Sequence, residues 1–276
     1  MGHSLFLYAL AFTFSPAIQY TCIDRRNMNM GYKLEICCGS YEDVCAAQRG
    51  GADRAELNSA LHMGGLTPSL ASLIMAKRDC QIPIIAMVRG RGAGFCYNET
   101  EKKVMLEDAA LLLEHGADGL AFGYLKEDAT IDEEAVRIMC DLIHSYGKCA
   151  VFHRAFDCVK DMDGAMEKLI SLGVDRVLTS GGQPNVEKGS EMLAHLQKTY
   201  GSQMEILAGC GVNEMNAKDL IEITKVQQLH SSCKVWKNDP TTIGKQVSYA
   251  YAAAPHEMAY DVVSEERVRA LRKAMM

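Results

Sequence analysis

Eight short apolar segments that alternate with helix-like stretches constrain the fold of this chain more than any other feature. The segments are residues 33–38, 54–57, 83–88, 119–122, 149–153, 176–179, 205–208 and 227–231. Most of them are continuous apolar runs, as in parallel strands that are buried on both faces. The stretches between them place apolar residues at helical spacing, as Met139, Leu142 and Ile143 illustrate. The alternation predicts a parallel β/α architecture.

A tripeptide repeat marks the turn from helix to strand in alternate units: Gly51-Ala52-Asp53, Gly116-Ala117-Asp118 and Gly173-Val174-Asp175. Glycine can adopt the left-handed conformation that ends a helix. Expected helix starts are Ser40, Thr67 followed by Pro68, and Asn213. The last helix is expected over residues 264–275, after a stretch without clear period over residues 232–263, and loops of that length are often functional.

Eight β/α units over residues 33–276 predict one domain, a TIM (β/α)8 barrel, whose usual size is about 250 residues. The rival is a doubly wound open sheet. That fold would normally carry Gly-x-Gly-x-x-Gly after the first strand, where this chain has Cys38-Gly39-Ser40-Tyr41. In a barrel, the functional site lies at the C-terminal ends of the strands.

Residues 1–32 precede the β/α pattern and contain a nearly continuous apolar run from Leu5 to Ile18. The run is shorter than the roughly 20 residues that span a bilayer. Only His3 could stand in for the basic region of a signal peptide. We expect a dispensable extension or a mis-called start, with a weak targeting or anchor signal as the alternative.

Charge and cysteine usage narrow the classes of partner and compartment. The net charge is −6 with no basic run, which argues against nucleic acid and anionic membrane as partners. The chain has 11 cysteines but no Cys-x-x-Cys, and several lie inside apolar segments. Buried thiols of this kind are typical of a reducing cytosol, so we expect a cytoplasmic protein.

Two carboxylates lie inside apolar strands, where an unpaired charge is costly. Side chains alternate along a strand, so Glu35 shares a face with Cys37, and Glu56 shares one with Asn58. Arg89 and Arg154 are the expected partners of Glu35 and Glu56. A structural ion-pair layer and a catalytic role are equally open for Glu35, while the position of Glu56 near a strand end favours function.

The densest polar cluster follows the fifth strand and contains His153, Arg154 and Asp157. A histidine at a strand end is suited to acid–base catalysis or to ligand binding. A lone strand histidine is also often a hydrogen-bonded core residue. Its charged neighbours favour the functional interpretation. The catalytic candidates are Glu35, Glu56, Arg89, His153, Arg154 and Asp157.

Glycine turns follow the sixth and seventh strands, and glycine allows backbone N–H groups to approach an anion closely. Ordinary tight turns are the alternative. A glycine-rich loop with two arginines, residues 88–95, resembles a mobile substrate clamp. Together these features predict a small anionic ligand. The substrate-binding candidates are Arg91, Ser180, Gly181, Gly182, Gly209, Gly211 and Ser231.

The cysteines allow only a limited metal site. Cys37 and Cys38 are adjacent and point to opposite faces of their strand, so they cannot both bind one ion. Cu(I) takes two or three soft ligands. Cys37 is the candidate metal ligand, with Cys96 or Cys210 as further donors, and buried thiols that serve only as small core residues are the alternative.

Several of these segments together resemble the copper homeostasis protein CutC family. They include Leu34-Glu35-Ile36-Cys37-Cys38, Ala55-Glu56-Leu57, Gly64-Gly65-Leu66-Thr67-Pro68-Ser69, Phe152-His153-Arg154-Ala155-Phe156-Asp157, Leu178-Thr179-Ser180-Gly181, Gly209-Cys210-Gly211-Val212 and His230-Ser231-Ser232. The resemblance runs from about Lys33 to the C-terminus. It implies a cytoplasmic TIM barrel that is often oligomeric and has a role in copper handling.

Two departures from the family pattern affect the copper site and the third-strand loop. Members credited with Cu(I) binding use cysteines on the first and second strands; Cys37 matches the first, whereas the second falls on Asn58. The loop after the third strand, residues 89–95, lacks the proline and aspartate of the family pattern. Two functions therefore stay open: copper binding, and an enzyme that acts on a small anionic metabolite.

Overall fold

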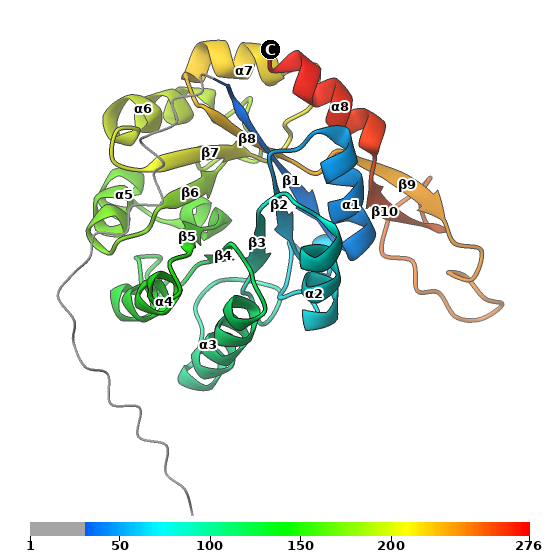
Figure 1. Cartoon of the computed structure of the whole chain (residues 1–276), viewed down its shortest axis with the longest axis horizontal. Coiled ribbons are helices and arrows are strands. Elements are labelled where there is room, and N and C mark those ends of the chain that lie inside the picture. Colours follow the sequence, from blue (N-terminus) through cyan, green and yellow to red (C-terminus); the bar gives the residue numbers. More distant parts are fainter. Residues whose placement is uncertain (1–30) are drawn as a thin grey trace, which may run out of the picture.

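Eight parallel strands close into a barrel in the order β1-β2-β3-β4-β5-β6-β7-β8 (Figure 1). They are β1 (Lys33–Cys38), β2 (Arg54–Leu57), β3 (Ile84–Met87), β4 (Gly119–Phe122), β5 (Cys149–Phe152), β6 (Arg176–Thr179), β7 (Glu205–Gly209) and β8 (Gln228–Ser231). The TIM-barrel prediction is confirmed, and every expected strand is present to within one residue at either end.

The computed structural model describes residues 31–276. The expected extension, residues 1–32, therefore lies outside the described residues except for Gly31 and Tyr32. In the described part of the chain, no helix is both long enough and apolar enough to cross a membrane.

Helices cover the outside of the barrel (Figure 1). They are α1 (Tyr41–Gly50), α2 (Leu70–Asp79), α3 (Glu99–Glu114), α4 (Glu133–Ser145), α5 (Met162–Ser171), α6 (Ser190–Tyr200), α7 (Ala217–Thr224) and α8 (Glu265–Ala274), with 3-10 turns η1 (Leu61–Met63) and η2 (Arg154–Cys158). Their apolar faces pack against outward side chains of the strands, such as Leu34, Ile36 and Cys38.

One of the three expected helix starts is confirmed. The Ser40 side chain accepts a hydrogen bond from the Asp43 N–H at the start of α1. The prediction for Thr67 is wrong, because Ser69 caps α2 while the Thr67 hydroxyl accepts from the Arg89 N–H. The prediction for Asn213 is also wrong, because α7 begins at Ala217 after Asn216. Ser, Thr and Asn side chains form hydrogen bonds in turns as readily as at helix N-caps, so the residue type alone does not determine where a helix begins.

The aspartate of each tripeptide repeat ties a new strand to the one before it. The carboxylates of Asp53, Asp118 and Asp175 accept hydrogen bonds from the N–H groups of Leu34, Ile84 and Ala150, at 2.7, 2.9 and 2.7 Å. The repeat glycines have φ of 91°, 93° and 82°, as the left-handed helix stop requires. The repeat is therefore a device for joining adjacent β/α units.

The inside of the barrel is apolar on one side and charged on the other. Ile85, Met87, Ala121, Cys149 and Val151 form the apolar half on β3, β4 and β5. Near the N-terminal ends of the other strands, Arg54 pairs with Glu35 and Arg176 pairs with Glu205.

Arg54 on the adjacent strand β2 is thus the partner of Glu35, so the expected pairing of Glu35 with Arg89 or Arg154 is wrong. The interpretation of Glu35 as part of an ion-pair layer agrees with its place there. Register explains the choice, because Glu35 lies opposite Arg54 in the β1–β2 pairing.

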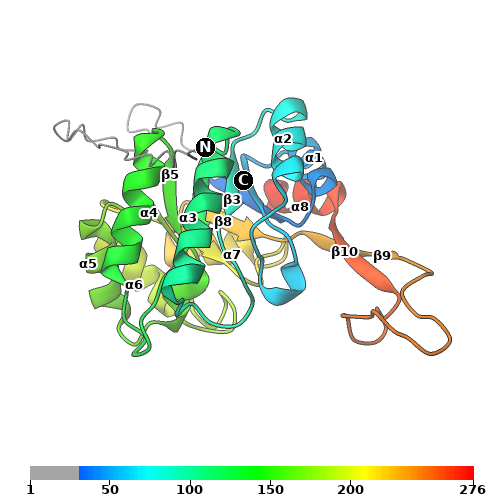
Figure 2. The same cartoon turned by 90° about the horizontal axis from the view of Figure 1, so that it is seen from below.

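The stretch 232–263, expected as irregular, contains a β-hairpin. Strands β9 (Lys234–Asn238) and β10 (Ala259–Val263) pair antiparallel, and the connecting loop extends away from the barrel (Figures 1 and 2). β9 is largely exposed and β10 is mostly half-buried, and neither has the continuous buried apolar run that identified the barrel strands.

Candidate functional site

A pocket of about 880 Å³ opens at the C-terminal ends of the barrel strands and extends to the hairpin. Eight of the candidates chosen from the sequence line it: Cys37, Glu56, Arg89, His153, Arg154, Asp157, Gly211 and Ser231. Glu35, Arg91, Ser180, Gly181, Gly182 and Gly209 are not among its lining residues. The C-terminal ends of the strands therefore mark the position of the pocket. A place near a strand end does not by itself tell which side chains line the pocket and which lie behind its lining.

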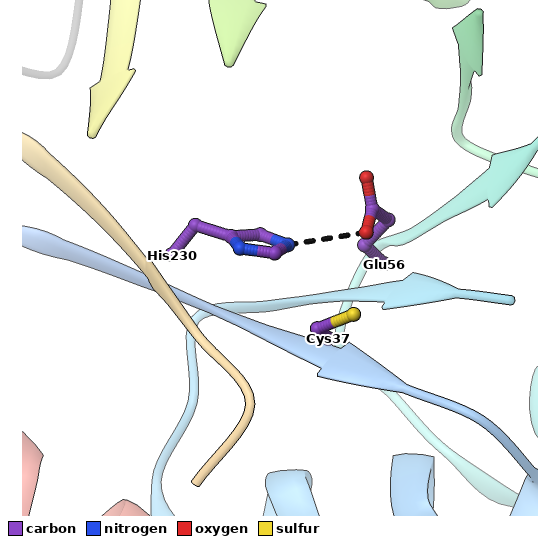
Figure 3. A group of neighbouring side chains, drawn as sticks. All are labelled: Cys37, Glu56 and His230. Atoms are coloured by element: carbon purple, nitrogen blue, oxygen red, sulfur yellow. Dashed lines mark hydrogen bonds and ion pairs between the residues drawn. The ribbon is translucent and has the colours of Figure 1, made fainter. Parts of the chain in front are cut away.

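Cys37, Glu56 and His230 converge at the floor of this pocket (Figure 3). Their donor atoms all lie within 4.8 Å of one another, and His230 Nε2 is 3.1 Å from Glu56 Oε2. The three come from β1, β2 and β8, which are neighbours in the closed barrel. His230 is not among the candidates chosen from the sequence, although it stands beside Ser231 at the end of the eighth strand.

Electrostatics make Glu56 and His230 an ion pair. Burial alone would raise the pKa of Glu56 and lower that of His230. Their mutual attraction outweighs burial, so the pKa of Glu56 lies below its usual range and the pKa of His230 lies above it. The floor therefore holds an imidazolium that donates a hydrogen bond to a carboxylate at 3.1 Å.

Asn58 connects this pair to the cysteine. Its Nδ2 donates to Glu56 Oε2 at 3.0 Å and lies 3.6 Å from Cys37 Sγ. Burial, followed by the negative charge of Glu56, raises the pKa of the Cys37 thiol well above its usual value. Cys37 is thus a protonated thiol at neutral pH, and any metal that binds here must displace a proton.

His153 lines the pocket, and one of its ring nitrogens is buried without a partner among the described residues. Its Nδ1 accepts the Ala155 N–H at 3.1 Å, so the ring proton of the neutral form lies on Nε2. His153 is 4% exposed, and within the described residues Nε2 has no hydrogen-bond partner. Burial and then the repulsion of Arg89, partly offset by Glu56, lower the pKa of His153 to about 4. The ring is a neutral N–H donor at pH 7.

Nitrogen NMR should observe this state directly. We expect the His153 imidazole to stay neutral with its proton on Nε2 down to a pH of about 4, because burial penalises the cation. A pH titration of protein labelled with nitrogen-15 in its histidine rings checks this. His115, an exposed histidine, is the internal reference. A midpoint for His153 near 6.5, the usual value for histidine, would contradict the assignment.

Arg89 is a buried anchor rather than a mobile rim residue. It is 4% exposed, and its guanidinium donates to the backbone carbonyls of Met63, Gly65 and Ala93 at 2.9, 3.0 and 2.6 Å. Its guanidinium is therefore part of the packing at the C-terminal end of the barrel. Its Nε has no partner within the described residues and is the second unpaired donor among the pocket residues.

Arg91 belongs to the scaffold of the same loop. Its Nε donates to Glu101 at 2.5 Å, and its other nitrogens donate to the carbonyls of Gly92, Gly94 and Cys96. These bonds hold the glycine-rich loop against the start of α3. Both arginines of the loop that the sequence suggested as a substrate clamp are thus hydrogen-bonded to the protein itself.

A carboxylate of the protein itself fills the glycine turn after β6. Asp157 accepts from the Ser180 N–H at 3.0 Å, the Gly182 N–H at 3.1 Å, the Thr179 hydroxyl at 2.5 Å and Arg154 Nε at 2.7 Å. The Gly181 N–H donates to the Thr179 hydroxyl instead. The backbone donors at Gly181 and Gly182 are therefore not available to the anion that we expected there.

The remaining candidates have mixed roles. A Cβ at Gly209 would lie 2.6 Å from the Leu178 side chain and 3.2 Å from His230 Cβ, so glycine is needed there for close packing. Gly211 lines the pocket with φ of 84°. The Ser231 hydroxyl donates to the Val212 carbonyl at 2.7 Å and fixes the loop after β7.

Comparisons with known proteins agree with this architecture. The CutC family model matches residues 32–235. A CutC family protein from Treponema denticola is 42% identical over 244 residues, which cover 88% of this chain and 98% of that protein. One from Vibrio vulnificus is 38% identical over 205 residues, with coverage of 74% and 82%.

A crystal structure from Streptococcus agalactiae, provisionally named a copper homeostasis protein CutC, superposes with a TM-score of 0.69 at 28% identity. The match covers 73% of this chain and 98% of that one. The extent of the family-model match, together with the identity to these relatives, settles the classification. This chain is a member of the CutC family.

Proposed function

We propose that this protein is a barrel enzyme that performs acid–base chemistry on a small anionic metabolite. The observation that carries the proposal is the buried His153 Nε2, a neutral donor without a partner in the wall of the pocket. An unpaired buried donor costs about 1–3 kcal/mol, which a ligand oxygen would relieve. Arg89 Nε adds a second such donor with positive charge.

In this proposal the anion binds at His153 and Arg89 rather than at the glycine turns. Carboxylate and phosphate oxygens accept from such donors, and bonds to a charged group are the stronger ones. Arg154, whose side chain is 40% exposed, lines the same pocket with its charge paired to Asp157. The Glu56–His230 pair supplies the group that takes or gives a proton at the pocket floor.

Isotope exchange tests the proposal. The protein is incubated in D2O with small 2-oxo acids and sugar phosphates, and mass spectrometry measures deuterium incorporated into each compound. We expect exchange into at least one compound, lost in Glu56→Gln and retained in Asp163→Asn, a surface carboxylate outside the pocket. Exchange that survives in Glu56→Gln would remove Glu56 from the chemistry, and no exchange in any compound would contradict the proposed reaction class.

Copper binding is the second candidate, and the convergence of Cys37, Glu56 and His230 is what favours it. The donor set fits Cu(I) poorly. It contains one thiol, which is protonated, one imidazole bonded to a carboxylate, and one hard oxygen ligand. Cu(I) prefers two or three soft donors. We therefore expect weak, sub-stoichiometric Cu(I) binding.

Asn58→Cys should raise the Cu(I) affinity by about tenfold or more, since it adds a second soft donor. The Asn58 amide nitrogen already lies 3.6 Å from Cys37 Sγ, so a thiol at position 58 would lie beside it. Competition against a Cu(I) chelator under reducing conditions measures the change. Ser59→Cys, one position along the chain, is the control. A wild-type protein that holds one tight equivalent, lost in Cys37→Ser, would refute the expectation of weak binding.

We also propose a cytoplasmic location. Within residues 31–276 no cysteines are joined in a disulfide, as expected in a reducing compartment.

A further inference from the structure

The pocket is larger than the anionic group alone requires. A volume of about 880 Å³ is in the range that holds a drug-sized molecule. The donors proposed for the anion, His153 and Arg89, follow β5 and β3, whereas residues of the hairpin also line the same pocket. That part includes the small apolar side chains of Ala252, Ala253 and Ala254.

Four rings from two separate segments line this outer part, and we call them the aromatic wall: His62, Trp236, Tyr251 and His256. Trp236 stacks on His256 with centroids 4.5 Å apart and an interplanar angle of 13°. Tyr251 lies 4.7 Å from His62, which belongs to η1 after β2. The wall thus connects the hairpin to a βα loop of the barrel.

We propose that the aromatic wall is a subsite for a planar ring, so that the natural ligand is an anion that carries a ring. This inference rests on the proposed function, because the anionic group of the same molecule is the one held at His153 and Arg89. Aromatic side chains bury a large area and bind rings in stacked or edge-to-face geometry. The side chains are already in mutual contact, so little rotamer freedom remains to be lost on binding.

The position of the wall also bears on specificity. The family-model match ends at residue 235, immediately before Trp236. The pocket floor lies within the matched range, whereas Trp236, Tyr251 and His256 follow it. In this subsite the hairpin supplies three of the four rings and η1 supplies His62, while Arg89 and His153 hold the anionic group.

The chain contains one tryptophan, and Trp236 is that residue, so its fluorescence reports on the wall directly. The probes are phenyl phosphate and inorganic phosphate, titrated separately at constant ionic strength. We expect phenyl phosphate to bind about tenfold more tightly, which corresponds to the contribution of an aromatic pair. Its binding should also change the Trp236 emission.

Variants on the hairpin separate a ring contact from a structural effect. Tyr251→Leu should reduce the preference for phenyl phosphate to about twofold or less, and Tyr251→Phe should restore it if the ring makes the contact. Tyr249→Leu is the matched control, because Tyr249 is on the same hairpin, is 82% exposed and does not line the pocket. A preference that persists in Tyr251→Leu would overturn the subsite.

The two proposals fail differently. Equal affinity of the wild-type protein for both probes would overturn the ring subsite while the anion site stands. If neither probe binds, the ring subsite falls together with the proposed anion site. Binding of both probes that survives in His153→Ala would leave the ring preference intact and remove His153 from the anion site.

Discussion

Arg54→Met is expected to lower the free energy of unfolding by about 3–5 kcal/mol, because it removes the cation that is hydrogen-bonded to a buried carboxylate. The Arg54 and Glu35 side chains are 11% and 2% exposed, and Arg54 Nη2 also donates to Gln228 at 2.8 Å. Glu35 has little access to water that could replace this partner. Urea denaturation followed by circular dichroism measures the loss.

Two further variants test this explanation. Arg49→Met removes an exposed ion pair with Glu265, whose side chains are 58% and 29% exposed, and should change stability little. The double variant Glu35→Leu/Arg54→Met should recover most of the loss, because it removes both buried charges. A loss in Arg54→Met no larger than in Arg49→Met would show that the layer inside the barrel does not depend on this pair.

Asp157→Ala is expected to lower the free energy of unfolding by about 4 kcal/mol, because several donors lose their acceptor at once. The donors include the Ser180 N–H, the Gly182 N–H, the Thr179 hydroxyl and Arg154, and both Thr179 and Ser180 are fully buried. The variant should also gain an anion site, since these donors would then surround a space of carboxylate size. Sulfate should raise its Tm.

The wild-type protein gives the comparison for the sulfate effect. Its glycine turn is filled by Asp157, so sulfate should raise the Tm of the variant more than that of the wild type, against chloride at matched ionic strength. Asp163→Ala removes an exposed carboxylate that accepts from His195 and Tyr200, and should show no such gain. An equal response of Asp157→Ala and wild type would mean that the turn does not bind anions.

Local features of the sequence were enough to establish the barrel. Continuous apolar runs, helical periodicity and the Gly-x-Asp repeat each depend on residues close together in the chain, so they survive without tertiary information. These local patterns also gave the position of the pocket, because the C-terminal ends of barrel strands meet at one face. Glu56 and His153 were identified in this way, and both line the pocket. The hairpin was missed because its strands, one exposed and one mostly half-buried, carry no comparable pattern.

Partners across the barrel depended on the tertiary structure. Glu35 lies opposite Arg54 on β2 and His230 on β8, and these pairings follow from how the strands are staggered as the barrel closes. The binding of Asp157, rather than an external anion, in the glycine turn also depends on the tertiary structure. Residues 157 and 180 meet only when β5 and β6 pair. The sequence determined which side chains stand at the strand ends, because alternation along a strand is local. The structure decided which of them neutralise one another and which, like His153 Nε2, have no partner among the described residues, because register and closure bring together residues far apart in the chain.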